Sequence, residues 1–441
     1  MRGLSARRFV SLATSWFLAF LVTGHWSLVT PSVWADEAET AALKAELEVL
    51  KNRLAKLEKQ VATAELKGVT GIGEKAGLPT LELPSGLQGL GISGYADVSY
   101  SYNFAEADPA TTANTGRTFD TESNGFTPHA FELVLEKPLS DEMPLGFRAD
   151  LFMGDDAPVI GATGLGLGTA GDEFELQQAY ITAHAPIGEG IDFKVGKFVT
   201  LLGAEVIESP ANWNFSRSYM FGFSIPFTHT GVLASYPLGE WGSTTLGVVN
   251  GWDIVDDNNK AKSLIGNITL TPFESLALSL NGITGAERAG DSRNKRTVIS
   301  NVVTWTTPIE GLTLMANHDF GHESGLAQAT ASATKGFDTA EWTGLALYAK
   351  YDISPTWYLA GRWEWFDDRD NTRTRLTSLG GSRPADIDFY GYTLTSQWTL
   401  YKHVLARLEY RHDKADEVVF LRDEGLTDYQ DTIAAELIYH F

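Results

Sequence analysis

Sixteen segments of about ten residues, rich in Val, Leu, Tyr, Trp and Thr, follow one another from residue 91 to the end of the chain. They cover roughly 91–104, 126–137, 145–154, 175–185, 191–198, 227–236, 243–253, 261–271, 275–285, 296–307, 312–320, 342–353, 356–367, 387–400, 403–413 and 429–441. Short connections alternate with long ones. An even number of antiparallel strands joined in this way predicts an all-β closed barrel of about 16 strands.

The segments alternate between an apolar and a charged face. In 403–413, Val404, Ala406, Leu408 and Tyr410 oppose His403, Leu405, Arg407, Glu409 and Arg411. The segments 356–367 and 145–154 follow the same pattern. Successive side chains of a strand point to opposite faces of its sheet. The pattern therefore favours a barrel with lipid outside and water inside, that is, a transmembrane antiparallel β-barrel.

The chain ends on a strand with the same alternation, closing on Tyr439 and Phe441. An aromatic carboxy-terminal residue resembles the signal by which outer-membrane barrels are handed to their assembly machinery. The alternative is a soluble sandwich that finishes on an amphipathic strand. The amino terminus favours the membrane interpretation.

Residues 1–35 have the features of a secretory signal peptide. Arg2, Arg7 and Arg8 precede an apolar run from Phe9 to about Val22, and Val33-Trp34-Ala35 offers a cleavage site. No later stretch is long and apolar enough to predict a membrane-spanning helix. We therefore predict an exported protein whose mature chain begins at about residue 36.

Residues 36–67 carry a heptad repeat. Its apolar positions are Leu43, Leu47, Leu50, Leu54, Leu57 and Val61, with Glu and Lys between them. A strict two-position stripe favours a coiled coil over a helix that lies on its own domain. We expect a periplasmic helix that supports a homotrimer. Residues 68–89 are rich in Gly and Pro and predict a linker to the barrel at 90–441.

Composition excludes several classes of function. The chain has a formal net charge of −22, which is unfavourable for binding nucleic acid. It has no cysteine, so it has neither disulfides nor a thiolate metal site. The protease motif H-E-x-x-H and the hydrolase motif G-x-S-x-G are both missing from the sequence. We predict no catalytic residue, metal or cofactor.

The acidic tracts Asp155-Asp156, Asp256-Asp257 and Asp367-Asp368-Arg369-Asp370 lie at loop edges and could hold Ca²⁺ or cations that bridge lipopolysaccharide. We interpret them as solvated loop edges, because no twelve-residue calcium-loop pattern surrounds them.

The longest connection, 199–226, differs in composition from an exposed loop. Its aromatic residues are Trp213, Phe215, Tyr219, Phe221 and Phe223. Large apolar side chains are costly to expose to water, so we expect the loop to fold into the barrel. A pore selects by its narrowest point and by the charges that line it. The loop is therefore the predicted constriction.

Charged residues of this loop and of the inward strand faces are the candidate lining of the constriction. They are Glu205, Glu208 and Arg217 in the loop, and Arg148, Lys194, Arg362, Glu364, Arg407, Glu409 and Arg411 on strands. Acids on one wall facing bases on the other would produce a transverse field that orients polar solutes. The alternative is structural salt bridges, with Glu132, Glu364 and Glu409 as acidic partners.

Motifs around the same loop resemble a known family. They are Gly203-Ala-Glu205-Val-Ile-Glu208, Asn212-Trp-Asn-Phe-Ser216-Arg217-Ser218, Pro226-Phe-Thr-His229-Thr230-Gly231-Val, Gln177-Gln178-Ala179-Tyr180 and Val195-Gly196-Lys197-Phe198. They are similar to those of the putative β-barrel porin-2 (OmpL-like) family, over about residues 90–441. The resemblance implies an outer-membrane channel for small hydrophilic solutes, but not which solutes it would select.

Three functions remain open at this point. The leading hypothesis is a trimeric passive porin in the bacterial outer membrane, surrounded by lipid, with its amino-terminal helix in the periplasm. The rival is a structural or adhesive outer-membrane protein that is tethered through the coiled coil. The third is a substrate-specific channel. The net negative charge suggests a weak preference for cations, which inward arginines would reverse locally.

Overall fold

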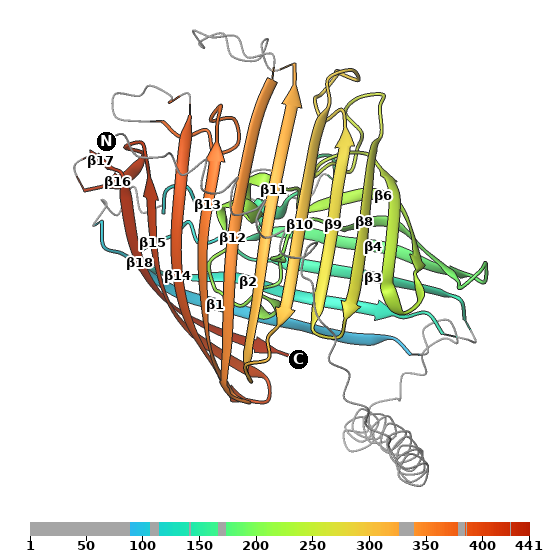
Figure 1. The fold of residues 1–441 in the computed structure, drawn as a ribbon, viewed down its shortest axis with the longest axis horizontal. Helices are drawn as coiled ribbons and strands as arrows, with labels where there is room; N and C mark the ends of the chain where they lie inside the picture. Colours follow the sequence, from blue (N-terminus) through green and yellow to red (C-terminus); the bar gives the residue numbers. More distant parts are fainter. Residues whose placement is uncertain are drawn as a thin grey trace, which may run out of the picture. The chain divides into compact units, whose positions relative to one another are not determined.

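The computed structural model describes residues 89–105, 114–140, 143–165, 173–325, 339–377, 384, 386–423 and 425–441. These residues form a closed antiparallel barrel of sixteen strands (Figure 1). The predicted signal peptide at 1–35, the coiled coil at 36–67 and all of the linker at 68–89 except Gly89 lie outside the described residues. In the part of the chain that is described, no helix is sufficiently long and apolar to cross a membrane.

The barrel strands agree with the sixteen predicted segments to within a few residues at most ends. They are β1 (Gly91–Asn103), β2 (Gly125–Lys137), β3 (Leu145–Met153), β4 (Phe174–Ala185), β5 (Ile191–Val199), β6 (Thr228–Pro237), β7 (Gly242–Val249), β8 (Ser263–Phe273), β9 (Leu276–Gly285), β10 (Arg296–Thr306), β11 (Leu312–Ser324), β12 (Thr339–Ser354), β13 (Trp357–Asp368), β14 (Ile387–Tyr401), β15 (Val404–Ala415) and β18 (Tyr429–His440). The predicted all-β barrel is confirmed.

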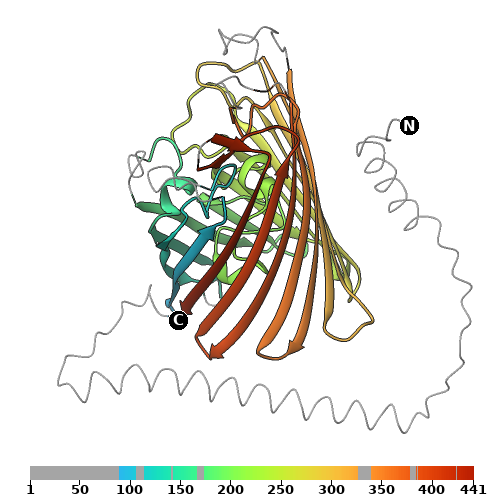
Figure 2. The ribbon, with the colours of Figure 1, turned by 90° about the vertical axis from the view of Figure 1, so that its left-hand side faces the viewer.

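Each barrel strand pairs with its neighbours along the chain, and β18 closes the ring by pairing with both β15 and β1. At this seam the Phe441 N–H donates to the Gly94 carbonyl at 2.9 Å, and the Gly94 N–H donates to the Phe441 carbonyl at 3.1 Å. Figure 2 shows the strands inclined to the barrel axis. The short elements were not predicted. They are a hairpin in the last long connection, formed by β16 (Phe420–Arg422) and β17 (Gly425–Thr427), and the short helices of the connections, among them α3 (Ala157–Ile160) and η5 (Gly239–Trp241).

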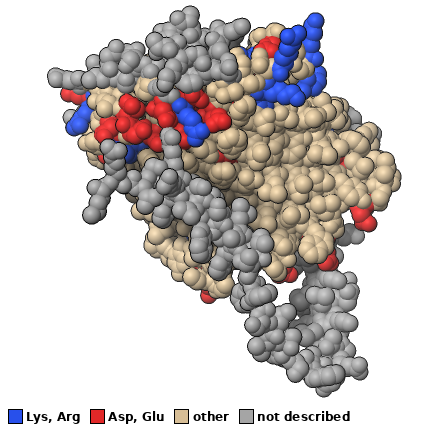
Figure 3. Space-filling view, turned by 45° about the horizontal axis from the view of Figure 1, so that its top comes forward, with Lys and Arg blue, Asp and Glu red and all other residues tan. Residues whose placement is uncertain are grey.

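The two faces of the strands differ as the sequence predicts. On β15, the side chains of Leu408 and Tyr410 are exposed on the outside, whereas Arg407, Glu409 and Arg411 are buried on the inside. In Figure 3, charged side chains gather toward one end of the barrel, and the wall in view is almost free of them. An uncharged outer wall is what a strand needs in order to face hydrocarbon.

A bulge interrupts the alternation on β4. Asp150 of β3 pairs with Gln178 and Leu151 pairs with Leu176, so Gln177 has no partner on β3. A bulge adds one residue to a strand and shifts its inside–outside pattern. As a result, the adjacent residues Gln177 and Gln178 are both buried.

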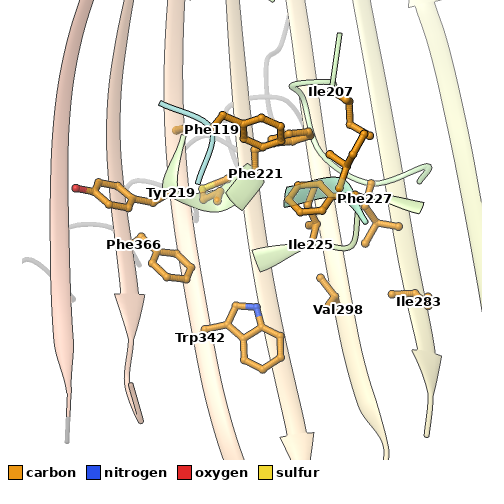
Figure 4. Packing of buried hydrophobic residues seen from close by; sticks show 14 of the residues in the cluster. Phe119, Ile207, Tyr219, Phe221, Ile225, Phe227, Ile283, Val298, Trp342 and Phe366 are labelled. Atoms are coloured by element: carbon orange, nitrogen blue, oxygen red, sulfur yellow. The ribbon is translucent and has the colours of Figure 1, made fainter. Parts of the chain in front are cut away.

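The apolar core lies inside the barrel. It forms where the connection between β5 and β6, residues 200–227, packs against the inner wall (Figure 4). We call this connection the lumen loop. Its core residues are Leu202, Ile207, Tyr219, Met220, Phe221, Ile225 and Phe227, which meet wall residues such as Val298, Trp342 and Phe366. Two short helices, η3 (Ser209–Ala211) and η4 (Met220–Ser224), shape the loop.

Candidate functional site

The lumen loop reaches across the barrel. It leaves from β5 and β6, and many of its hydrogen bonds are with β13, β14 and β15, which lie six to eight places around the ring of strands. We call β13–β15 the far wall and β2–β5 the near wall. The aromatic composition of the loop predicts that it folds into the barrel. The structure agrees, because Phe215, Tyr219 and Phe221 are all buried.

Carboxylates of the far wall hold backbone N–H groups of the loop. Glu409 accepts from Phe215 N at 2.7 Å and from Ser216 N at 3.0 Å. Glu364 accepts from Tyr219 N at 2.6 Å. A buried backbone group without a partner is costly, and an irregular loop cannot satisfy its own groups as a strand does. The far wall therefore supplies the hydrogen bonds that let this loop be buried.

Arginines of the far wall hold the backbone carbonyls. Arg407 donates to Ser209 O at 3.1 Å and to Asn212 O at 2.7 Å. Arg411 donates to Arg217 O at 2.7 Å, and Arg362 donates to Ser216 O at 2.5 Å. A guanidinium carries five donors in a fixed plane, so one arginine can bind several carbonyls and an acid together.

The same side chains belong to a buried chain of ion pairs. In order, the pairs are Asp120–Arg117 (2.5 Å), Arg117–Asp413 (2.6 Å), Asp413–Arg411 (2.8 Å), Arg411–Glu364 (3.4 Å), Glu364–Arg362 (3.1 Å) and Arg362–Glu205 (2.8 Å). All seven residues are less than 9% exposed. Alternating charge along the chain offsets the cost of removing each group from water.

The near wall keeps charged side chains that are partly open to the lumen. The Arg148 side chain is 25% exposed and that of Glu136 is 45% exposed, with 3.3 Å between their charged atoms. The Lys194 ammonium lies 4.3 Å from the ring centre of Tyr180. Glu208 of the lumen loop faces this wall and accepts from Gln177 Nε2 at 2.6 Å.

The structure thus divides the ten predicted lining residues into two groups. Glu205, Arg217, Arg362, Glu364, Arg407, Glu409 and Arg411 are buried together with the loop. Arg148 and Lys194 lie on the near wall, and Glu208 lies in the lumen loop and faces that wall. Five of the seven buried residues form ion pairs, namely Glu205, Arg362, Glu364, Arg407 and Arg411. Glu364 is an acidic partner, as in the alternative that we considered, whereas Glu409 and Arg217 bind backbone groups of the loop. Arg407 pairs with Glu436 at 3.0 Å rather than with Glu409.

Several residues of this network were not among the predicted ones. Arg117 and Asp120 come from the connection after β1, and Asp413 comes from β15. Asp413 lies two residues beyond Arg411 on the same inward face, so the alternation could have identified it. The sequence gives a weaker indication that Phe119 belongs to the site. This apolar residue in a polar connection packs on Phe221 and Phe227 of the lumen loop, with ring centres 5.7 and 5.6 Å apart.

Two of the three acidic tracts that we interpreted as solvated loop edges are partly buried, so the interpretation is wrong for Asp155-Asp156 and for Asp367-Asp368. Asp256 is exposed, as that interpretation expects. Asp156 is buried and lies 3.0 Å from His129 Nδ1. Asp368 is buried and accepts from the backbone N–H groups of Thr372, Arg373 and Thr374. The Asp368 carboxylate thus satisfies the backbone of the connection that follows its strand, whereas that of Asp156 binds a histidine side chain.

The end of the lumen loop is fixed by two connections on its other side. Asp253, in the connection after β7, accepts from Phe227 N at 2.8 Å and Thr228 N at 2.9 Å. Burial raises the pKa of Asp253 to about 6. Arg373, after β13, stacks between Trp252 and Trp342 and donates to Phe223 O at 2.6 Å. Burial lowers the pKa of Arg373 to about 9.

Comparisons with solved structures show the same fold. The barrel is similar to the outer membrane channel DcaP of Acinetobacter baumannii, with a TM-score of 0.52, 13% identity, and coverage of 80% of this chain and 97% of that one. It is also similar to an anion-selective porin from Comamonas acidovorans (TM-score 0.51, 12% identity, 80% and 99% covered) and to a trimer form of OmpT of Vibrio cholerae (0.51, 11%, 80% and 99%).

No curated protein matches the sequence. A family profile does match it, over residues 89–441, and this profile describes the putative β-barrel porin-2, OmpL-like proteins. The matched residues include the whole barrel and the lumen loop, which agrees with the resemblance drawn from the motifs. The chain therefore belongs to the putative β-barrel porin-2 (OmpL-like) family of bacterial outer-membrane porins.

Proposed function

We propose that this porin lets small hydrophilic solutes and ions diffuse passively across the outer membrane, through a lumen that the lumen loop narrows. One observation carries the proposal: the loop spans from β5 and β6 to the far wall and is bonded there by Arg362, Glu364, Arg407 and Glu409. A fixed constriction selects by its width and its charges, and it needs no moving part.

The passage runs along the near wall in this proposal. The far wall is occupied by the loop, whereas Arg148, Glu136, Lys194 and Glu208 keep part of their surface open. In this proposal, Arg148 and Lys194 of the near wall lie opposite Glu208 of the lumen loop and supply the transverse field of a polar constriction. The buried residues of the far wall have a positioning role, because they set where the loop lies.

The proposed assembly is a homotrimer in the outer membrane. OmpT of Vibrio cholerae has been solved in a trimer form, and its barrel has the same fold. The heptads at 36–67 are proposed to form a periplasmic coiled coil that supports the trimer. The outer face of the barrel would then contact both neighbouring barrels and lipid.

Single-channel current in a planar bilayer, with a KCl gradient across it, tests the function. Steps that arrive in threes would establish a trimeric porin. Arg148→Ala and Lys194→Ala should each move the reversal potential toward cation selectivity, because each removes a base from the proposed passage. Arg369→Ala is the control, since Arg369 lies beyond β13 and pairs with Glu341 at 2.6 Å.

An unchanged reversal potential in both near-wall variants would place the passage elsewhere. No conductance from a protein shown to be folded would overturn the porin proposal. It would favour the rival function, in which the coiled coil tethers the barrel and the connections contact other surfaces.

A further inference from the structure

Three carboxylates meet where the lumen loop touches the near wall. They belong to Glu132 on β2, Asp150 on β3 and Glu208 in the loop. One oxygen of each lies within 4.8 Å of the other two. Like charges at this separation repel, so the cluster is stabilised by a proton, by a compensating charge or by a bound cation.

The pairing of β2 with β3 brings two of these three carboxylates together. Val134 of β2 pairs with Asp150, and Glu132 pairs with Phe152, so Glu132 and Asp150 are diagonal neighbours on the inner face. Glu208 arrives from the loop just before η3. The β4 bulge adds two amides, because Gln177 donates to Glu208 at 2.6 Å and Gln178 donates to Asp150 at 2.5 Å.

The protein's own cations do not balance these charges. Arg148 Nε donates to both oxygens of Asp150, at 2.9 and 3.0 Å, and its Nη1 turns to Glu136. Among the described residues, neither Glu132 nor Glu208 forms an ion pair with a lysine or arginine. The far wall differs, since its buried acids pair with arginines or bind N–H groups of the loop.

Glu132 gives independent evidence that a ligand is needed. Its side chain points into the cluster, the residue is only 2% exposed, and its Oε1 has no hydrogen-bond partner. The Oε1 atom of the neighbouring Gln177 is likewise buried without a partner. Buried carboxylate oxygens are normally paired or bound to a metal.

We propose that Glu132, Asp150 and Glu208 bind a hard divalent cation, best matched by Ca²⁺, inside the lumen. Ca²⁺ takes carboxylate and amide oxygens at about 2.3–2.6 Å, so two oxygens on opposite sides of the ion are about 4.6–5.2 Å apart. The cluster fits within that span. The ion joins the loop to β2 and β3, as the arginines join it to the far wall.

A second acidic group in the lumen does not carry the same inference. His129 lies near Asp155 and Asp156, but both of its ring nitrogens are already bound, one by Ser99 at 2.7 Å and one by Asp156 at 3.0 Å. That group is satisfied by the protein alone. The proposed cation site can be tested separately from the proposed porin function, since cation binding does not require an open channel.

Calorimetric titration of the EDTA-treated, detergent-solubilised full chain with Ca²⁺ tests the proposal. We expect one saturable site per chain, and at least a tenfold loss of affinity in Glu132→Gln and in Glu208→Gln. Asp291→Asn is the control for cations bound elsewhere on the protein, because Asp291 lies on the connection between β9 and β10 and does not belong to the cluster. This variant should bind Ca²⁺ as the wild type does.

Thermal unfolding gives a second measurement on the same proteins. Ca²⁺ should raise the unfolding temperature of the wild type and leave that of Glu208→Gln unchanged. Glu208 lies in a loop, so its substitution spares the barrel strands, and a retained β-sheet circular dichroism spectrum verifies the fold. Absence of saturable binding by the wild type, or equal affinity in folded Glu132→Gln and Glu208→Gln, would overturn the proposal.

Discussion

The charged residues of the lumen serve the backbone of a loop as much as they serve one another. Arg362 is an example, because it contacts Glu205, Glu364 and the Ser216 carbonyl from one buried position. Removing one member of a buried ion pair leaves the other charged and without compensation, which costs about 3–5 kcal/mol. Exposed pairs contribute about 0–1 kcal/mol.

Arg362→Met should therefore destabilise the barrel by about 3–5 kcal/mol, measured as the loss of unfolding free energy in urea. Arg369→Met is the matched control. The Arg369 side chain is 44% exposed, so its loss should cost at most about 1 kcal/mol. Equal losses in the two variants would show that the buried network does not hold the loop.

Asp253 makes stability depend on pH. Its folded pKa of about 6 lies above the ordinary value of 3.8, so folding favours the protonated carboxyl. This contribution to stability is complete below the ordinary pKa and is lost as the pH rises through 6, by at most about 3 kcal/mol. The wild type should therefore lose stability relative to Asp253→Asn between about pH 4 and pH 7. Parallel stability curves over that range would contradict the assignment.

At this scale the sequence predicts which side chains point inward, but not what they touch. The alternation places Arg362, Glu364, Arg407 and Glu409 on the inner face, because the period of a strand is local. Their partners depend on the path of the lumen loop, which no local pattern specifies. For this reason we predicted Glu409 as a lining residue, or in the alternative as the partner of a base, whereas it binds Phe215 N and Ser216 N.

Among the elements, the strands were predictable and the exceptions to their pattern were not. Sixteen segments with period two give the barrel, since each strand needs only an apolar outer face and turns at its ends. The β4 bulge at Gln177 could not be predicted, because the adjacent polar residues Gln177 and Gln178 are compatible with either face of the strand. The β16–β17 hairpin was missed because its strands are only three residues each.

The seam between the first and last strands gives a prediction at this scale. A Cβ atom at Gly94 would overlap the Glu132 carbonyl oxygen of β2 and lie 2.9 Å from Phe441 Cζ. Gly94→Ala should therefore displace a strand where the barrel closes and cost about 1–3 kcal/mol. Gly91→Ala is the matched control on the same strand, since its Cβ would lie 3.6 Å from the Glu136 carbonyl oxygen, an ordinary contact. Urea unfolding of both variants measures the difference, and an equal cost would show that the seam tolerates the added atom.

The molecule consists of a barrel with an apolar core inside it, and this arrangement determines where the charged side chains of the strands lie. A soluble domain buries its apolar residues and exposes its charges. Here the charged residues of the strands meet inside the ring, where they bind the lumen loop, while Leu408, Tyr410 and other apolar residues face outward. A barrel of this kind closes its own sheet edges, so association between chains requires other surfaces.

The heptads at 36–67 are proposed to provide one such surface, and substitutions that preserve chain length can test it. In the proposed helix, Leu50 and Leu54 would occupy the apolar seam, whereas Lys56 and Lys59 would lie on the opposite side. Leu50→Ala/Leu54→Ala should lower the temperature at which the purified trimer dissociates, because it removes apolar contacts between helices. Lys56→Ala/Lys59→Ala should leave that temperature unchanged.

The current through each channel should be the same in both variants, since the lumen loop belongs to the barrel and does not involve residues 36–67. Light scattering across a temperature series measures the dissociation. If the trimers of the two double variants dissociate at the same temperature, the helix does not hold the trimer together. Residues 36–67 are then better explained as a tether that binds another partner.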